Sequence, residues 1–148
     1  MRLCRYQHNG NVDIGYYTEE GLVPLARLAA HRGVRLARLS EHLVDYLPPE
    51  GAHFSLAKDL WIAFEKLPAE QRRHLTQPFA GVKLRAPVPR PGKIFLLAGN
   101  YAAHVRESGK KPPNRQDSYP YFFMKPQTAV NHPGEPIVLL RISPHHIT

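Results

Sequence analysis

Two side chains that could act together in catalysis lie three residues apart in the segment AGNYAAHVRESG, residues 98–109. If residues 102–108 are helical, His104 and Glu107 share one face, because positions three apart are neighbours on a helix surface. A carboxylate that hydrogen-bonds an imidazole holds it in one tautomer and stabilises its protonated form, so the pair can serve as a general base that activates a water. The alternative is an ordinary polar pair at the start of a surface helix.

The same segment lacks the signatures of several other chemistries. The apolar run IFLLAG is followed neither by a glycine-rich phosphate loop with a Lys-Ser/Thr pair nor by the dinucleotide fingerprint G-x-G-x-x-G. The nucleophile elbow G-x-S-x-G is also absent from the sequence. Nucleotide-phosphate binding and serine-hydrolase chemistry of these kinds are therefore not indicated.

The wider context is more specific than the pair itself. The run PVPRPGKIFLLAGNYAAHVRESG, followed by YFFMKPQTAV and HPGEPIVL, resembles the fumarylacetoacetate hydrolase family over about residues 86–141. Members typically enter the catalytic domain through P-x-P-R-P-G-K-I, continue into G-x-N-Y-x-x-H-x-x-E, and then show F-x-K-P and a G-x-P-I-V-L strand. The N-terminal MRLCRY and the hairpin after it also resemble the small N-terminal domain of many bacterial members.

The resemblance implies a role for each matching residue. His104 and Glu107 fall on the family's His–Glu dyad, which sits on a lid and activates a water for attack on a carbonyl. Lys125 falls on a lysine that contacts the carboxylate or enolate oxygen of the substrate. Asn100 and Tyr101 match the pair at the strand end that shapes the entrance. Taken without the motif, Lys125 would be interpreted as a solvated loop lysine.

The resemblance also implies a substrate class and a cofactor. Family substrates are acylpyruvates and related β-diketo or 2-oxo acids, typical of aromatic compound catabolism, and hydrolysis, decarboxylation and isomerisation of these acids all create an enolate. A divalent Mg or Mn ion can chelate the two oxygens and stabilise that charge. A lysine adds positive charge, and a positioned base moves the proton or the water.

The sequence departs from the family where the metal ligands belong. In the family a D-x-E-x-E run typically follows the PIVL strand, but in this sequence PIVL continues as LRISPHHIT, which contains no acid. The acids after residue 84 are Glu107, Asp117 and Glu135. Mg²⁺ and Mn²⁺ prefer a cluster of oxygen ligands. His145 and His146 are adjacent and point apart, so they are not a bidentate pair. We therefore expect no metal ligand in this sequence, no bound cofactor, a truncated family member, and little or no hydrolase activity from this chain alone.

The charge distribution is consistent with that expectation. The net charge is +8, with 11 Lys/Arg against 9 Asp/Glu in residues 1–83 and 9 against 3 in residues 84–148. Such asymmetry indicates either an anion-binding surface or acidic partners supplied by other sequence. No nucleic-acid recognition motif or aromatic–basic array is present, so we expect no nucleic-acid partner. A non-catalytic binding module that pairs with a homologous or complementary chain, or a homo-oligomer, is the alternative to an enzyme.

The cellular compartment is indicated by three features. The single cysteine, Cys4, cannot form an internal disulfide and is typical of a reducing compartment. No apolar run approaches the roughly 20 residues that span a bilayer. The polar N-terminus MRLCRYQHNG lacks a signal-peptide core. We expect a cytoplasmic protein with no membrane partner.

The elements that must position these residues indicate an α+β protein. We predict a small N-terminal α+β domain at 1–83, built from a β-hairpin plus helices, and at 84–148 the first part of an incomplete mixed β-roll of the hydrolase-like catalytic domain. The Asn-Gly turn in HNGN predicts a hairpin over residues 1–23, with LVPL as a third short strand. The strands expected in the second part are KIFLLAG, YPYFFMK and PIVLLRIS.

Leucine periodicity predicts the helices. Leucines spaced three and four apart indicate a helix over residues 25–47, which Gly33 could split. Ser55 is the expected N-cap of a second helix, whose apolar stripe comprises Leu56, Leu60, Ala63, Phe64 and Leu67. Pro68 can begin a short third helix, AEQRRHL.

Overall fold

The chain folds into two compact units. The computed structural model describes residues 1–48, 50–99, 101–114, 116 and 119–138. One unit contains Met1–Pro89 together with the segment that begins at Asn131, and the other is Arg90–Val130. The predicted division into an N-terminal domain at 1–83 and a catalytic-domain fragment at 84–148 remains a prediction.

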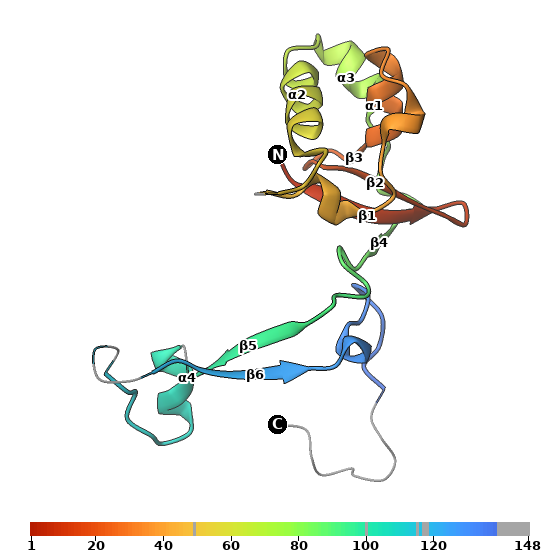
Figure 1. Ribbon diagram of the computed structural model, residues 1–148. Helices are drawn as coiled ribbons and strands as arrows, with labels where there is room; N and C mark the ends of the chain where they lie inside the picture. The colour runs from red at the N-terminus through yellow and green to blue at the C-terminus, as the bar shows by residue number, and fades with distance from the viewer. Residues whose placement is uncertain (49, 100, 115, 117–118, 139–148) are drawn as a thin grey trace. The chain divides into compact units, whose positions relative to one another are not determined.

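The first unit is built on a four-stranded antiparallel sheet (Figure 1). Its strands are β1 Leu3–His8, β2 Asn11–Tyr17, β3 Leu22–Pro24 and β4 Lys83–Arg85, in the order β3-β2-β1-β4. The β1–β2 turn places Asn9 and Gly10 at φ of 49° and 84°. Two consecutive residues with positive φ are typical of the hairpin turn that the Asn-Gly pair predicts. The predicted hairpin and the third short strand are confirmed.

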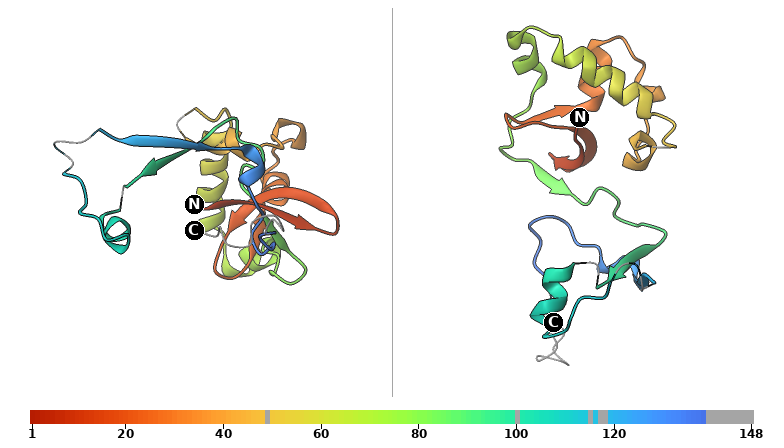
Figure 2. Two further views of the ribbon diagram at one scale, coloured as in Figure 1. Left: turned by 90° about the horizontal axis from the view of Figure 1, so that it is seen from below. Right: turned by 90° about the vertical axis from the view of Figure 1, so that its left-hand side faces the viewer.

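Helices cover one face of this sheet (Figures 1 and 2). They are α1 Leu25–His31, α2 Phe54–Glu65 and α3 Ala69–Leu75, with short 3-10 turns η1 Leu36–Arg38 and η2 Leu43–Tyr46. Their apolar residues join those of β2 and β3 in one core, formed by Ile14, Tyr16, Val23, Leu25, Leu28, Ala29, Leu43, Tyr46, Ala57, Leu60, Phe64 and Leu75. The apolar stripe predicted for the second helix is buried at Leu60 and Phe64.

Two helix predictions are wrong in their bounds. The single helix over 25–47 is replaced by α1, which ends at His31, and by the two 3-10 turns. Gly33 adopts a φ of 69°, a left-handed conformation that ends a helix, so the glycine splits the pattern completely. Ser55 is not the N-cap of α2, because the helix already begins at Phe54 after His53, which makes no side-chain cap. The third helix is confirmed, with Pro68 at its N-cap.

Tyr16 is the side chain that ties the sheet to α2. It has no exposed surface, and its hydroxyl donates a hydrogen bond of 2.8 Å to the carbonyl oxygen of Ala57. Its ring centroid lies 5.2 Å from that of Trp61, which lies 5.5 Å from that of Phe64. Residues of β2 and α2 are thus joined by both aromatic packing and a buried polar contact.

The second unit is a two-stranded ribbon with a helical excursion. The strands β5 Ile94–Ala98 and β6 Tyr121–Lys125 pair antiparallel, from Ile94 opposite Lys125 to Ala98 opposite Tyr121. The helix α4 Ala102–Glu107 lies between them in sequence, and the 3-10 turn η3 Gln127–Ala129 follows β6. Both predicted strands are confirmed. The third, PIVLLRIS, is not a strand over residues 136–138, and its remainder lies outside the described residues.

Together the units have the predicted α+β class, with helices and antiparallel sheets. No helix in the part of the chain that the structure describes combines the length and the apolar character needed to cross a membrane.

The Tyr16 contact generates a stability prediction. Tyr16→Phe removes the hydroxyl and leaves the buried Ala57 carbonyl without this donor, so we expect the free energy of unfolding to fall by about 1–2 kcal/mol. Urea unfolding followed by tryptophan fluorescence measures it. Tyr17→Phe is the matched control, expected to change stability by less than about 0.5 kcal/mol. Equal effects of the two variants would contradict the assignment.

Burial of Cys4 generates a reactivity prediction. Desolvation raises the pKa of its thiol to about 11 from 9.0, and its sulfur also contacts the Gly15 carbonyl oxygen at 3.5 Å. Because the thiolate is the reactive form, we expect alkylation by iodoacetamide at pH 7.5 about 100-fold slower than in a peptide of residues 1–8. The rate should keep rising with pH toward 11. Alkylation within about threefold of the peptide rate would show that Cys4 is not protected.

Candidate active site

The helix α4 positions the His–Glu pair. It begins after Tyr101, whose backbone is extended, and the Val105 N–H donates a hydrogen bond of 3.1 Å to the Tyr101 carbonyl oxygen. It ends at Ser108, whose hydroxyl donates to the Val105 carbonyl oxygen at 2.7 Å, and Gly109 follows with a φ of 75°. The helical turn predicted around residues 102–108 is confirmed over Ala102–Glu107.

His104 and Glu107 form the contact that their spacing predicts. The Nδ1 atom of His104 lies 3.0 Å from Oε2 of Glu107. Because an ionised carboxylate only accepts hydrogen bonds, Nδ1 carries the proton, which leaves the lone pair of Nε2 available to take a proton. The orientation is therefore that of a general base held by a carboxylate.

The pair is open to solvent. The side chains of His104 and Glu107 are 80% and 72% exposed, and no residue of α4 is buried. Half-buried Val105 has its Cγ2 atom 3.8 Å from the point that a Cβ on Gly99 would occupy, which places this side chain beside the turn that follows β5. Exposed ion pairs contribute about 0–1 kcal/mol, so the contact orients the imidazole more than it stabilises the fold.

The other predicted site residues are not gathered around the pair. Tyr101 is 73% exposed at the start of α4, and Asn100 lies outside the described residues. Lys125 is exposed and pairs with Ile94, whereas α4 follows Ala98 at the other end of the ribbon. Four residues along a strand span about 13 Å, so Lys125 and the strand end that leads into α4 are separated by that distance. The functional roles of these residues stay predictions.

The residues that the structure describes do not fit a Mg or Mn site. No group of three or more His, Cys, Asp or Glu side chains comes together among them. In Arg90–Val130 the described carboxylate is that of Glu107, and it is paired with His104. His145 and His146 lie outside the described residues. A divalent cation with hard-oxygen preferences would therefore need ligands other than these side chains.

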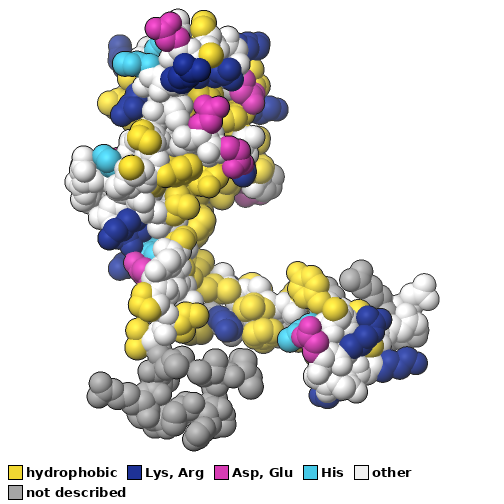
Figure 3. Space-filling model, turned by 180° about the vertical axis from the view of Figure 1, so that it is seen from behind, with side chains coloured by type: hydrophobic (Ala, Val, Ile, Leu, Met, Phe, Trp, Pro, Cys, Tyr) yellow, Lys and Arg dark blue, Asp and Glu magenta, His cyan; other side chains and the backbone are white. Residues whose placement is uncertain are grey.

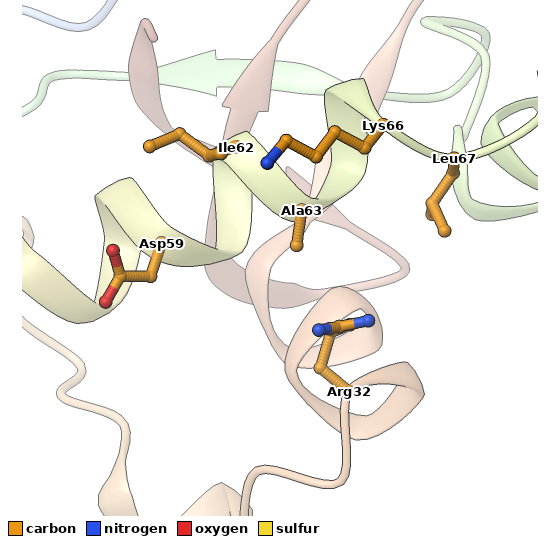
Figure 4. Close-up of a pocket in the computed structure, with 6 residues that line it drawn as sticks. All are labelled: Arg32, Asp59, Ile62, Ala63, Lys66 and Leu67. Carbon is orange, nitrogen blue, oxygen red and sulfur yellow. The ribbon is translucent and has the colours of Figure 1, made fainter.

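A surface cavity lies elsewhere, between the end of α1 and one face of α2 (Figure 4). It has a volume of about 330 Å³ and is lined by Arg32, Asp59, Ile62, Ala63, Lys66 and Leu67. The lining belongs entirely to the first unit and holds none of the predicted site residues. The sequence does not predict this cavity, because a groove between two helices leaves no local pattern. We assign the candidate site to α4.

The sequence also contains a signal for the end of the helix that carries the pair. Ser108-Gly109 directly follows the His–Glu pair, and a glycine after a polar residue is a common helix stop. This pair ends α4 within one residue of Glu107. The helix α4 is therefore short because of its own sequence.

Comparison with known proteins identifies the second part of the chain. Residues 93–146 match the family described as Fumarylacetoacetate (FAA) hydrolase C-terminal. Residues 93–146, called the hydrolase-family segment below, are therefore similar to part of the C-terminal domain of this family. The His–Glu pair, Lys125 and both strands of the ribbon lie inside the hydrolase-family segment.

Individual relatives match over part of the chain. An uncharacterized protein of Pyrococcus horikoshii is 48% identical over 54 residues, which are 36% of this chain and 22% of the relative. Protein Rv2993c of Mycobacterium tuberculosis is 40% identical over 70 residues, 47% of this chain and 24% of that protein. The mitochondrial oxaloacetate tautomerase of Schizosaccharomyces pombe is 42% identical over 45 residues, 30% and 19% of the two chains. The matched segments thus span less than a quarter of the length of these relatives.

The tautomer of His104 can be measured directly. Nitrogen-15 NMR of the imidazole at pH 8 should show the proton on Nδ1, because Glu107 accepts it. In Glu107→Ala the two tautomers should approach the mixture of a free imidazole. Exposed His74 on α3 provides the control, expected to give the same spectrum in both proteins. A wild-type proton on Nε2 would show that the dyad does not form.

Proposed function

We propose that the hydrolase-family segment contributes the lid and a substrate-contacting strand to an enzyme acting on small 2-oxo or β-diketo acids. The observation that carries the proposal is the 3.0 Å contact between His104 and Glu107 inside the matched segment. A His–Glu pair at i and i+3 is common on surface helices, and the family match is what makes this one a catalytic candidate.

The proposed chemistry follows from the groups that this chain holds. Nε2 of His104 would remove a proton either from a water that attacks a carbonyl or from the carbon next to the ketone of a 2-oxo acid. Glu107 would hold the Nδ1–H and stabilise the imidazolium that results. The ammonium of Lys125 would bind a carboxylate or the enolate oxygen. This last role requires a closed arrangement in which Lys125 and the dyad reach the same substrate.

Oxaloacetate is the substrate to test first. The Schizosaccharomyces pombe relative carries the name oxaloacetate tautomerase, which supports proton transfer next to a 2-oxo group as the reaction class to test. In tautomerisation the base takes a proton from carbon 3, the enolate oxygen receives a proton, and no bond between heavy atoms breaks. In hydrolysis water would attack the neighbouring carbonyl and the enolate would itself be the leaving group, whereas in decarboxylation carbon dioxide would leave and the enolate would remain.

We further propose that carboxylates from another polypeptide segment complete the site. The six described Lys/Arg residues of Arg90–Val130 face one described acid, Glu107; they are Arg90, Lys93, Arg106, Lys110, Lys111 and Lys125. The family commonly uses a Mg or Mn ion, which in a completed site would supply Lewis-acid stabilisation of the enolate. Such an ion would be held by these added carboxylates, since the described residues do not fit it. By itself this chain would then turn over little substrate.

A binding module is the second candidate function, and the exposed ribbon supports it. Phe95 and Leu97 of β5 lie opposite Met124 and Phe122 of β6, so the four side chains share one face. Their residues are 59%, 43%, 67% and 59% exposed in that order, and hydrophobic side chains are visible along this ribbon in Figure 3. A two-stranded ribbon is marginal in water without a packed face. A complementary chain, or a second copy of this one, would cover it.

An enolisation assay tests the enzyme proposal. The rate at which the enol absorbance of oxaloacetate decays or forms should be close to buffer for this chain alone, with or without added Mg²⁺ or Mn²⁺. Mixing with the separately produced part of the Mycobacterium tuberculosis relative that lies beyond the match should raise the rate. His104→Ala should then lower the gained rate by about 100-fold or more.

Control variants and contrary outcomes separate the two candidates. His74→Ala, at an exposed position on α3, should leave the gained rate unchanged. Binding of the added part without any gain in rate would favour the binding module. Full metal-dependent turnover by this chain alone would contradict the proposal that another segment completes the site.

A further inference from the structure

A six-residue strap, residues 131–136, returns to the first unit and attaches to β4. The backbone N–H of Ala86 donates a hydrogen bond of 3.0 Å to Nδ1 of His132. Nη1 of Arg85 donates to Oε1 of Glu135 at 2.7 Å. These contacts join residues 46 and 50 positions apart, so the strap encloses the whole of Arg90–Val130 between two attached points.

The strap holds its own shape. The N–H of Glu135 donates to the His132 carbonyl oxygen at 3.1 Å across a turn in which Gly134 has a φ of 76°. The side-chain amide of Asn131 donates to the carbonyl oxygens of Glu135 and Pro136 at 3.1 and 3.2 Å. These hydrogen bonds hold the turn without using the side chains of His132 and Glu135, which instead make the two contacts with Arg85 and Ala86.

The His132 attachment exists in one protonation state. A backbone N–H can only donate, so Nδ1 must offer a lone pair, and the imidazole must be neutral with its proton on Nε2. A proton on Nδ1 would place two donors against each other. Ala86 is 4% exposed, so water cannot readily replace the lost acceptor, and a buried N–H without a partner is costly.

The charges around this contact do not compensate for a protonated imidazole. From β1, Nη1 of Arg5 donates to the Ala86 carbonyl oxygen at 3.0 Å. From β4, Arg85 holds Glu135 and also contacts the side-chain amide oxygen of Gln7. Two guanidinium groups and one carboxylate therefore surround the site, and the carboxylate is already engaged.

We propose that the strap is a pH-sensitive latch, closed onto β4 while His132 is neutral and released when His132 is protonated. Histidine changes charge between about pH 5 and 8, so release would occur as the pH falls through this range. Release would leave Arg90–Val130 attached to the first unit through the chain at Pro89 alone. The inference rests on hydrogen-bond chemistry at β4 and is independent of the proposed enzyme function.

Amide exchange and nitrogen-15 NMR of the full chain test the latch. At pH 8 the proton of the His132 ring should be on Nε2. Protection of the Ala86 amide, corrected for the intrinsic exchange rate, should be lost as the pH falls from 7.5 to 5.5, because a protonated imidazole offers the Ala86 N–H no lone pair. An Nδ1 proton at pH 8, or unchanged protection, would overturn the proposal.

Two variants separate the latch from general acid sensitivity. His132→Gln keeps an acceptor that does not titrate, so its Ala86 protection should stay constant over the same pH range. His31→Gln, at an exposed position at the end of α1, should retain the wild-type pH dependence. A pH dependence that persists in His132→Gln would assign the effect to another group and overturn the latch, and the wild-type measurement decides the proposal even if a variant does not fold.

Discussion

Burial of apolar side chains against one face of the β3-β2-β1-β4 sheet is the interaction on which the described structure depends. Every buried residue of the described chain lies between Tyr6 and Ala86, and Tyr16, Leu22, Val23 and Leu28 are among those with no exposed surface. Removal of apolar surface from water is the dominant favourable contribution to folding, at about 25 cal/mol per Å². The first unit therefore has a core of its own, built by three helices on a sheet.

The second unit has no comparable core among its described residues, so its candidate catalytic pair lies in contact with solvent. A general base works best where water is excluded, because electrostatic interactions strengthen in a site of low dielectric constant. The His104–Glu107 pair is already oriented, yet it is open to solvent on a helix with no buried residue. Orientation is local to α4, whereas exclusion of water would require surfaces that cover α4 and the apolar ribbon.

The strap is attached to the first unit by polar contacts outside its apolar core. Attachment of residues 131–136 to β4 depends on one backbone hydrogen bond and one ion pair. These contacts are modest in energy individually, but they close a chain segment of about 40 residues, whose ends would otherwise be free to separate. Small polar contacts can thus close a long chain segment.

The sequence by itself determined the features that depend on neighbouring residues. The Asn-Gly pair predicts the first hairpin because both residues tolerate positive φ, and the spacing of His104 and Glu107 predicts their contact because a single helical turn brings them together. The resemblance to the hydrolase family could also be recognised from the sequence, because it depends on a dense run of fixed residue types. The family match over residues 93–146 confirms it.

Only the tertiary structure decided what depends on residues far apart. The leucine pattern over 25–47 continues past Gly33, but α1 ends at His31, and beyond it Leu43 and Tyr46 enter the core from the 3-10 turn η2. The register of β5 with β6 places Lys125 at the opposite end of the ribbon from the strand end that leads into α4. The bond between Ala86 and His132 spans 46 positions, and no local pattern encodes such a pairing, because hydrogen-bond partners at that separation are chosen by the folded backbone.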